Sequence, residues 1–405
     1  MPNPISGKNI LLGITGSIAA YKAADLASKL TQSGAAVDAI LTPAALRFIT
    51  PLTFQSVTGR KAFTDDDLWG GEGHVRHIGL GLAGDLLAVA PASANTIAKL
   101  AHGIADNLLT VTALAARCPL LLAPAMDGGM FSHPATQANL DILRQRGAII
   151  VGPAEGRMAS GLVGLGRMVE PAELLGQVRL ALAKGGPLSG VHVLVTAGGT
   201  QEPVDPVRYL TNRSSGKQGY ALAQSALDAG AAVTLLHTPV DLPTPAGARD
   251  VLVHTAAEMK EAILVAAAES QVVLMAAAVA DFRPAQVAAH KIKKGADSLL
   301  LQLEPTEDIL LALAARRLPG ALPNVVIGFA AESQSLEENA AKKLSAKRLD
   351  MIVANDISAT DAGFGVDTNR VTFLYPDGRR EVLPLQSKAA VADEVLQRVI
   401  AMLAK

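Results

Sequence analysis

A chain of 405 residues is too long for one hydrophobic core, because single domains usually contain roughly 100–200 residues. Half of the residues are hydrophobic and only 3% are aromatic, which is typical of α/β sheets covered by helices. A net charge of −1, with no dense basic segment, argues against a nucleic-acid partner. No apolar run reaches the ~18 residues that a membrane helix needs. The single cysteine, Cys118, excludes an internal disulfide framework. With no signal-peptide pattern at the start, we expect a cytoplasmic enzyme of two domains.

The first half of the chain alternates predicted strands and helices. The opening strand, helix and strand are expected at 9–15, 17–33 and 37–42. Further strands are expected at 85–91, 119–126 and 148–152, and further helices at 94–101, 107–117, 134–146 and 171–184. Repeated β–α alternation predicts a parallel, doubly wound sheet. The glycine-rich segment 185–190 is the expected linker.

The second half restarts the same alternation without repeating the sequence of the first. Strands are expected at 191–196, 231–237, 271–277, 324–329 and 350–354, and helices at 217–229, 256–269, 306–317, 335–347 and 387–403. A Pro-Asp-Gly turn at 376–378 predicts a late hairpin between 371–375 and 381–385. Residues 239–250, rich in proline and glycine, are expected to form a loop.

The segment after the strand at 191–196 carries the strongest chemical signal. The strand ends in Ala197-Gly-Gly-Thr200, where missing side chains let backbone N–H groups approach a phosphate. A polar loop then leads into the helix at 217–229, whose N-terminus favours anions. The donors of this loop are Arg208, Asn212, Arg213, Ser214, Ser215 and Lys217. This pattern predicts a site for a nucleoside triphosphate or a phosphate ester rather than an ordinary surface loop.

Three further clusters fit a nucleotide site. Asp281 follows a strand end of small residues, where it can hold a metal or a ribose hydroxyl, although a helix N-cap is equally consistent. The segment Lys291-Ile-Lys-Lys294 either forms a solvated face or neutralises an anion. Lys343 and Lys347 lie four residues apart and share a helix face, which suits a surface helix as well as a triphosphate.

The segments TAGGTQEPVDPVRYLTNRSSGKQG, AAVADFR, KIKK, GFAAES and VANDIS occur in this order between residues 191 and 400. They resemble the ligase half of the bifunctional phosphopantothenoylcysteine decarboxylase/phosphopantothenate–cysteine ligase family. The resemblance implies coenzyme A biosynthesis. CTP, with Mg²⁺, would activate the carboxylate of 4′-phosphopantothenate as an acyl-cytidylate, and L-cysteine would then displace CMP.

The resemblance also implies site residues in the second half. Asn212 would contact the activated acyl group, Lys291 would serve its conversion, and Asp281 is the candidate metal ligand. The implied CTP contacts are Met275, Ala276, Ala277, Asp281, Lys291, Thr306, Glu307, Asp308, Ile309, Phe329, Lys343 and Lys347. The segment Thr306-Glu-Asp-Ile departs from the Asn-Pro-Asp-Ile of the family pattern.

In the first half, Gly13-Ile-Thr-Gly-Ser17 lacks the GxGxxG spacing of a dinucleotide site, which disfavours a Rossmann dehydrogenase and favours a single phosphate at a helix N-terminus. Together with the segments 90–96, 103–108 and 124–130 it resembles the FMN-binding cysteine decarboxylase family over residues 7–180. The resemblance implies that FMN removes a hydride from the carbon bearing sulfur, CO₂ leaves, and the hydride returns to give 4′-phosphopantetheine. It places His77 as the active-site base and surrounds FMN with Gly16, Ser17, Ser93, Asn95 and Met126.

Two catalytic positions of the first half depart from the family pattern. Asp127 stands where the family has Asn, and Ser160 stands where the glycine-rich flap at 156–167 usually has Cys. An ionised Asp cannot donate a hydrogen bond to a carboxylate, although a neutral Asp can. A serine hydroxyl is a poorer proton donor than a thiol of pKa ~8.5. We expect decarboxylation to persist with another acid or a water. The alternative is a ligase whose N-terminal half is a catalytically silent FMN-binding assembly or regulatory module.

These inferences give a complete expectation for the chain. Residues 1–186 form a flavodoxin-like, FMN-dependent decarboxylase domain, and residues 187–405 form a Rossmann-like, CTP-dependent ligase domain. The resemblance implies a homo-oligomer of trimeric decarboxylase domains and dimeric ligase domains, which together can build a dodecamer. Its expected partners are the small-molecule substrates 4′-phosphopantothenate, L-cysteine and CTP, without nucleic acid or membrane.

Overall fold

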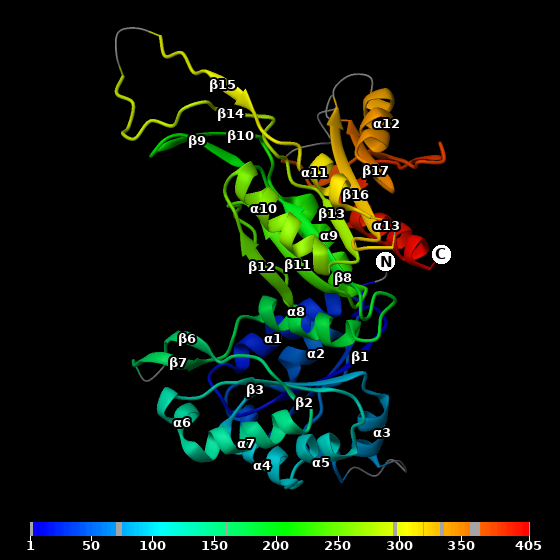
Figure 1. Ribbon diagram of the computed structural model, residues 1–405. Coiled ribbons are helices and arrows are strands. Elements are labelled where there is room, and N and C mark those ends of the chain that lie inside the picture. The colour runs from blue at the N-terminus through cyan, green and yellow to red at the C-terminus, as the bar shows by residue number, and fades with distance from the viewer. Residues whose placement is uncertain are drawn as a thin grey trace. The chain divides into compact units, whose positions relative to one another are not determined.

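The computed structural model describes residues 3–69, 75–158, 161–294, 298–318, 320–332, 336–356 and 365–404. The chain divides into two compact units, an N-terminal unit that ends at Leu182 and a C-terminal unit that begins at Ala183 (Figure 1). Each unit has its own sheet and its own core. Within the described part of the chain, no helix has the length and hydropathy needed to cross a membrane.

The N-terminal unit contains a five-stranded parallel sheet in the order β2-β1-β3-β4-β5, which is the flavodoxin-like order. Its strands are β1 (Asn9–Ile14), β2 (Ala36–Leu41), β3 (Leu86–Ala92), β4 (Leu120–Pro124) and β5 (Ile149–Ile150), and β6 (Ala154–Arg157) and β7 (Val163–Arg167) form a separate hairpin. Its helices are α1 (Ala20–Gln32), α2 (Pro51–Thr58), α3 (Arg76–Ala83), α4 (Ala94–His102), α5 (Leu108–Ala115), α6 (Gly128–Ser132), α7 (Pro134–Gln145) and α8 (Pro171–Ala183).

Both faces of this sheet are buried, which explains why its strands are continuous apolar runs. Successive residues of β1 point to opposite faces, so Ile10 and Leu12 belong to one core cluster and Leu11 to another. The first cluster includes Leu26 of α1, and the second includes Ile97 of α4. The predicted doubly wound architecture is confirmed for this unit.

The C-terminal unit contains an eight-stranded sheet in the order β12-β11-β8-β13-β16-β17-β19-β20. The first six strands are parallel in the Rossmann order, and the last two are antiparallel. These strands are β8 (His192–Ala197), β11 (Ala232–His237), β12 (Ala248–Leu252), β13 (Val272–Met275), β16 (Val325–Glu332), β17 (Met351–Asp356), β19 (Val371–Leu374) and β20 (Arg380–Val382). The predicted hairpin around residues 376–378 is therefore confirmed as β19–β20.

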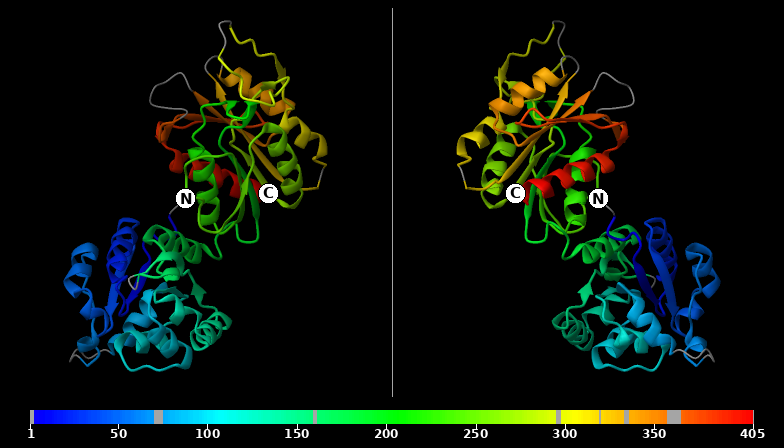
Figure 2. Two further views of the ribbon diagram at one scale, coloured as in Figure 1. Left: turned by 90° about the vertical axis from the view of Figure 1, so that its left-hand side faces the viewer. Right: turned by 90° about the vertical axis from the view of Figure 1, so that its right-hand side faces the viewer.

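Helices cover both faces of this second sheet. They are α9 (Lys217–Asp228), α10 (Ala256–Ala266), α11 (Ile309–Arg316), α12 (Leu336–Ala346) and α13 (Lys388–Leu403). Right-handed crossovers place α9 on one face and α10, α11 and α12 on the other. In agreement, Met259, Leu313 and Leu344 of the latter three helices share one core cluster, whereas α13 packs against α9 (Figure 2).

Several short elements of the C-terminal unit were not predicted. The polar loop after β8 contains a hairpin of β9 (Gln201–Asp205) and β10 (Arg208–Thr211), and the loop expected at 239–250 overlaps strand β12. A second hairpin, β14 (Phe282–Pro284) with β15 (Leu303–Pro305), flanks a projecting segment that we call the arm, of which the structure describes residues 285–294 and 298–302 (Figure 1). Two further short strands, β18 (Thr368–Asn369) and β21 (Gln386–Ser387), pair antiparallel next to α13. Strands of two to five residues with polar or charged side chains lack the apolar alternation from which strands are predicted.

A partly buried charge network joins the edge hairpin β19–β20 to α13. Glu381 Oε2 accepts from Arg398 Nη2 at 2.8 Å, and Tyr375 Oη donates to Glu381 Oε1 at 3.0 Å. Burial disfavours the carboxylate, but the hydrogen bonds from Arg398 and Tyr375 outweigh it and lower the pKa of Glu381. Burial and the neighbouring Glu381 raise the pKa of Tyr375 to about 12.

We expect E381Q to lower the free energy of unfolding by about 1.5–3 kcal/mol at pH 7, because it removes the charged acceptor of this network. The folded-state pKa lies below the ordinary Glu value of about 4.3, so this stability is present above that value and is lost as pH falls through the folded-state pKa. Urea unfolding followed by circular dichroism at pH 7 and at acidic pH measures the difference. E338Q, which changes an exposed pair with Lys342, is the control. An equal deficit for E381Q at both pH values would contradict the charge argument.

Candidate functional site

The C-terminal unit has a cavity of about 650 Å³ at the carboxyl ends of its central parallel strands. This edge is where ligands bind in doubly wound sheets. The cavity brings together every residue that the sequence implied for CTP or acyl contact except Lys291. These residues are Asn212, Met275, Ala276, Ala277, Asp281, Thr306, Glu307, Asp308, Ile309, Phe329, Lys343 and Lys347.

One wall of the cavity is built by the start of α11 and the end of α12. Asp308 caps α11 by accepting from Leu311 N at 3.1 Å, and its other oxygen pairs with Lys347 Nζ at 2.8 Å. Thr306 Oγ1 donates to Ala280 O at 2.5 Å, which ties this wall to the end of β13. The ammonium of Lys347 is thus held at the cavity by a helix-capping carboxylate.

The neighbouring Glu307 is engaged in an ion pair with α10. Its Oε2 lies 2.6 Å from Lys260 Nζ, and this hydrogen bond lowers the pKa of Glu307. Glu307 is therefore a charged carboxylate whose ion-pair partner in this structure is Lys260.

Asn212 is fixed at the cavity by the backbone of the neighbouring strand end. Its Nδ2 donates to Ala278 O at 3.3 Å and to Val279 O at 3.1 Å. The turn before it needs glycine, because Gly198 has a φ of +86° and a Cβ on Gly199 would lie 2.8 Å from Asn212 O. With its amide nitrogen held in this way, Asn212 presents a positioned amide at the cavity.

The N-terminus of α9 forms a second wall. Gly216, with a φ of +74°, precedes the helix, and the N–H groups of Lys217, Gln218 and Gly219 have no acceptor in the described part of the chain. A Cβ on Gly219 would approach Thr196 O to 2.7 Å, so only glycine lets α9 lie this close to β8. Free N–H groups at a helix N-terminus are typical of an anion site, and the sequence predicts such a site at this loop.

Asp281 lines the cavity as an exposed carboxylate whose backbone carbonyl accepts from Thr306 N at 2.9 Å. Among the described residues, no group of three or more His, Cys, Asp or Glu side chains could hold a metal ion. Mg²⁺ is commonly bound by one or two carboxylates together with substrate phosphates and water. A single carboxylate next to an anion site fits that mode of binding and does not fit a closed structural metal site.

Lys291 lies outside this cavity. It is an exposed residue of the arm, next to Ile292, whose N–H donates to the buried Asp205 at 3.1 Å and whose carbonyl accepts from Arg208 at 3.0 Å. These bonds fasten the base of the arm to hairpin β9–β10 instead of to the cavity. Within one chain, Lys291 is therefore not brought together with Asn212 and Asp281.

Four polar residues on the cavity wall had no predicted role. They are Gln218, Asn355, Asn369 and Lys388. Gln218 and Asn355 lie in the family-like motifs, whereas Lys388 lies in none of them. The sequence places Lys388 at the start of the helix expected at 387–403, where a cation is unfavourable, and the structure shows Ser387 as the N-cap.

In the N-terminal unit, the predicted FMN residues follow the carboxyl ends of β1, β3 and β4. Thr15 Oγ1 donates to Pro91 O at 2.7 Å and accepts from Ser93 N at 2.9 Å, which joins the ends of β1 and β3. The N–H groups of Gly16, Ser17 and Ile18, before α1, have no acceptor among the residues that the structure describes. This turn fits the phosphate of FMN, since free N–H groups at a helix start bind anions.

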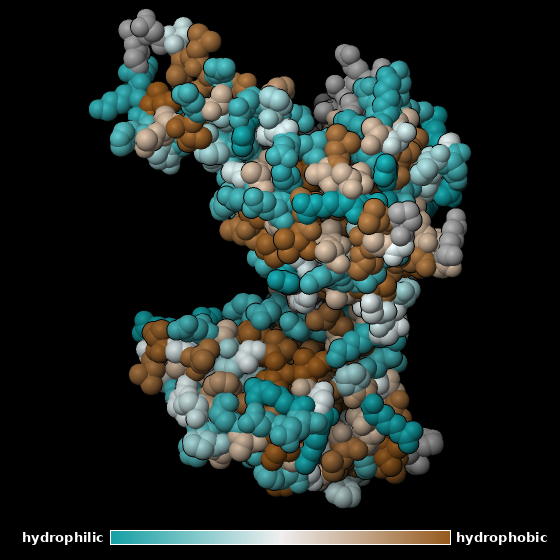
Figure 3. Space-filling view, viewed as in Figure 1, coloured by the Kyte–Doolittle hydropathy of each residue, from teal (hydrophilic) through white to brown (hydrophobic). Residues whose placement is uncertain are grey.

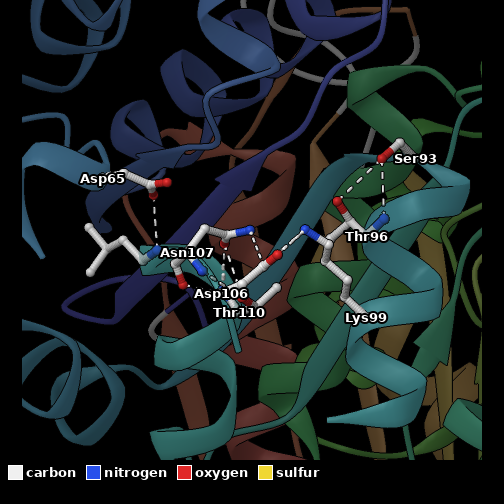
Figure 4. Close-up of polar contacts among 8 residues, drawn as sticks. Asp65, Ser93, Thr96, Lys99, Asp106, Asn107 and Thr110 are labelled. Atoms are coloured by element: carbon white, nitrogen blue, oxygen red, sulfur yellow. Dashed lines mark hydrogen bonds and ion pairs between the residues drawn. The ribbon is translucent and has the colours of Figure 1, made fainter. Parts of the chain in front are cut away.

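Two of the family-like motifs in this unit also have structural roles (Figure 4). Ser93 caps α4 by accepting from Thr96 N at 3.4 Å, and Asn107 caps α5 in a reciprocal capping box. Asp106 pairs with Lys99 Nζ at 2.7 Å. Asn95 is exposed at the start of α4. A side chain used as a cap is oriented by the fold, so Ser93 reaches the sheet edge in a defined position.

The catalytic candidates of this unit lie on different elements. His77 is the second residue of α3, and its Nδ1 is buried without a hydrogen-bond partner in the described structure. Asp127 caps α6 by accepting from Gly129 N at 3.0 Å. Met126 N donates to Gly166 O at 3.0 Å, so hairpin β6–β7 lies against the segment of Asp127. Ser160 lies outside the described residues.

A smaller cavity of about 270 Å³ lies at the opposite, amino-terminal end of β4 and includes none of the predicted FMN residues. Cys118 lines it, and burial raises the pKa of this thiol. A thiol with a raised pKa is rarely ionised and is therefore a poor nucleophile, which fits a packing role for Cys118.

A flavodoxin-like unit followed by a Rossmann-like unit with a cavity at the ligand edge of its sheet is the architecture of a two-domain α/β protein that binds cofactors or nucleotides. The Flavoprotein family model matches residues 2–181, and the model for the DNA/pantothenate metabolism flavoprotein C-terminal domain matches residues 188–403. The chain is 45% identical over 401 residues to the coenzyme A biosynthesis bifunctional protein CoaBC of Bacillus subtilis (strain 168), with 98% of each chain covered. It is also 45% identical over 399 residues to CoaBC of Vibrio cholerae serotype O1, again over 98% of each chain.

A crystal structure of the C-terminal domain of a CoaBC protein is 40% identical, covers 54% of this chain and 99% of that chain, and has a TM-score of 0.46. The full-length relatives carry the assignment. The chain belongs to the family of coenzyme A biosynthesis bifunctional proteins. The resemblance expected from the sequence motifs is thereby confirmed.

Proposed function

We propose that the chain is a bifunctional enzyme of coenzyme A biosynthesis. Residues 187–405 join L-cysteine to 4′-phosphopantothenate with CTP, and residues 1–186 decarboxylate the product with FMN. Family membership supports this assignment. The observation that carries it is the cavity that gathers Asn212, Asp281 and the two lysines Lys343 and Lys347 at the ligand edge of the second sheet.

The ligase step needs two negatively charged substrates in one site. A carboxylate oxygen of 4′-phosphopantothenate attacks the α-phosphorus of CTP, and pyrophosphate leaves. The cysteine amine then attacks the acyl carbon, loses a proton, and CMP leaves. Lys343 and Lys347 neutralise the triphosphate, and the fixed amide of Asn212 orients the acyl group. Asp281 is the residue that would hold Mg²⁺ together with substrate phosphates, and the ion would supply further charge neutralisation there.

We also propose that the arm joins two copies of the C-terminal unit, and that Lys291 acts in that assembly. The arm and the hairpins beside it expose large hydrophobic side chains, as the brown atoms at its position in Figure 3 show. These are Val207, Tyr209, Phe282, Val287, Leu299, Leu300, Leu301 and Leu303. Exposed apolar surface of this extent is typical of protein interfaces. Since Lys291 lies on the same arm, pairing offers it a route to a reacting acyl group.

The decarboxylase step requires a base and an electron acceptor. FMN, when bound, accepts a hydride from the carbon bearing sulfur and returns it after CO₂ has left. His77 accepts the thiol proton during the oxidation, and the unpartnered Nδ1 of His77 fits that role. Loss of CO₂ from the thioaldehyde leaves an enethiolate. A hydride and two protons then complete 4′-phosphopantetheine. The silent-module alternative has less support, because it gives His77 no function.

The two activities predict that two substitutions in the full chain block different steps of the reaction sequence. With 4′-phosphopantothenate, L-cysteine, Mg²⁺ and CTP, H77N should release pyrophosphate at the wild-type rate and stop at 4′-phosphopantothenoylcysteine. N212D should lose amide formation by roughly 100-fold or more, because a carboxylate replaces the amide beside an anionic acyl group. N212D should still decarboxylate supplied 4′-phosphopantothenoylcysteine. Mass spectrometry of products measures both effects.

H102N is the matched control for H77N, because His102 is exposed and bonds only Asn139 on the same unit. Wild-type protein that forms the amide but leaves supplied 4′-phosphopantothenoylcysteine unchanged would support the silent-module alternative. Wild-type protein that forms no amide from CTP and cysteine would refute the proposed ligase.

The arm proposal predicts that L300D breaks the assembly of the C-terminal units. Leu300 is 92% exposed, so the change does not disturb a core and acts only where another copy covers it. We expect a smaller particle in analytical ultracentrifugation, a loss of ligation, and normal decarboxylation of supplied substrate. L318D, at an exposed leucine away from the arm, is the control. An unchanged particle size for L300D would exclude the arm as the interface.

A further inference from the structure

Two helices of the C-terminal unit begin with a lysine at the same cavity. Lys217 is the first residue of α9, Lys388 is the first residue of α13, and both line the cavity wall. Lys388 is only 7% exposed as a residue, it lines the cavity, and its ammonium donates no hydrogen bond to the described residues. A largely buried lysine normally has an anionic partner, since leaving its charge unpaired is costly. Lys388 therefore requires an explanation.

The electrostatic surroundings of Lys388 are unfavourable for a cation. The partial positive charge of a helix N-terminus repels it, and α13 and α9 both begin here. Burial lowers the pKa of Lys388, and the charge of Lys217 lowers it further, while Asp367 acts in the opposite direction. Asp367 is already bonded to Lys217 Nζ at 2.6 Å and is largely exposed. Around the Lys388 side chain, the described charged neighbours are thus Lys217 and Asp367, and their sum with Lys388 is a net positive charge.

The same place offers further free polar groups. The N–H groups of Lys217, Gln218 and Gly219 lack acceptors within the described ranges, so three backbone donors lie beside the two lysines of the cavity wall. The position of these groups is fixed, because Gln218 Nε2 donates to Lys388 O at 3.1 Å and Gln218 Oε1 accepts from Asn369 at 3.1 Å. The two helix starts are therefore held together as one rigid anion-binding wall.

Packing of the lysine stem alone does not account for this arrangement. The aliphatic part of a lysine is often buried while its ammonium reaches bulk water. Here the side chain lines a cavity between two helix N-termini, where a neutral residue of the same length would bury as much apolar surface without the charge conflict. A bound anion resolves that conflict, and no described protein group does.

This wall lies across the sheet edge from the lysines assigned to CTP. Lys343 and Lys347 come from α12 on one face of the sheet, whereas α9 and α13 belong to the other. The cavity thus has cationic groups on both walls, and the proposed reaction has two substrates that carry phosphate. We propose that Lys388, together with the N-terminus of α9, binds the phosphomonoester of the pantothenate substrate. This inference rests on the proposed ligase function and extends it to a residue outside the recognised motifs.

Binding to the full-length protein tests the inference directly. By titration calorimetry, we expect K388Q to weaken the binding of 4′-phosphopantothenate by roughly 10- to 100-fold, the usual effect of losing a charged hydrogen bond. Binding of pantothenate, which lacks the phosphate, should change less than twofold, and so should the KM for CTP. K388R should recover part of the affinity, because it keeps the charge. K342Q, at an exposed lysine paired with Glu338, is the control and should bind both ligands normally.

Thermal unfolding of the ligand-free protein separates binding from folding. We expect the Tm of K388Q to equal or exceed that of the wild type, because an unpaired buried charge is removed. The inference is overturned by equal losses for pantothenate and 4′-phosphopantothenate, by unchanged binding of both, or by a weakened CTP interaction in place of the phosphomonoester. If the ligase assignment itself is wrong, the wild-type protein forms no amide in the activity assay. The binding measurements on the Lys388 variants do not depend on that assay, so they still decide whether Lys388 binds the phosphomonoester.

Discussion

In each unit the ligand edge of the sheet depends on a buried threonine hydroxyl at the end of the first strand. In the N-terminal unit, Thr15 accepts from Ser93 N at 2.9 Å, and in the C-terminal unit Thr196 accepts from Ala277 N at 3.0 Å. The first bond joins the end of β1 to the end of β3, and the second joins the end of β8 to the end of β13. These are the points where the strand order of each sheet reverses. The helices that follow the two strands lie on opposite faces of the sheet, so a crevice remains beyond the strand ends. A short hydroxyl that accepts a backbone N–H keeps the strand ends together and leaves space beyond them for a ligand.

The charges of the C-terminal cavity differ in how far the protein itself neutralises them. Lys347 has Asp308 at 2.8 Å, and Lys217 has Asp367 at 2.6 Å, so both ammonium groups are held ready by carboxylates. Lys388 has no such partner among the residues described. A site that must bring two anions together gains most from cations that are already in place and already desolvated. The cost is a less stable ligand-free protein, which substrate binding offsets.

The sequence predicted the parallel strands and long helices well, because apolar runs and helix-spaced apolar residues report burial directly. The cavity residues were also predicted, since the motifs that carry them each follow a parallel strand and such strands share one edge. The short strands β9, β10 and β12 were not predicted, because their residues lack an apolar alternation. They are strands only because β9 pairs with β10 and β12 pairs with β11 in the folded chain. Lys291 illustrates the same limit. Its position is decided by bonds of Asp205 and Arg208 to Ile292, which are distant in the sequence.

One of the departures from the family pattern in the N-terminal unit, Asp127, lies where hairpin β6–β7 meets the segment after β4. Asp127 caps α6, and a Cβ on the next residue, Gly128, would lie 2.8 Å from Leu165 O of hairpin β6–β7. Ser160 lies between these two strands in the sequence. The hairpin therefore approaches the residue after Asp127 so closely that only glycine fits at the contact. Two independent contacts, the cap bond of Asp127 to Gly129 N and the glycine contact beside it, thus fix the position at which this chain replaces the Asn of the family pattern.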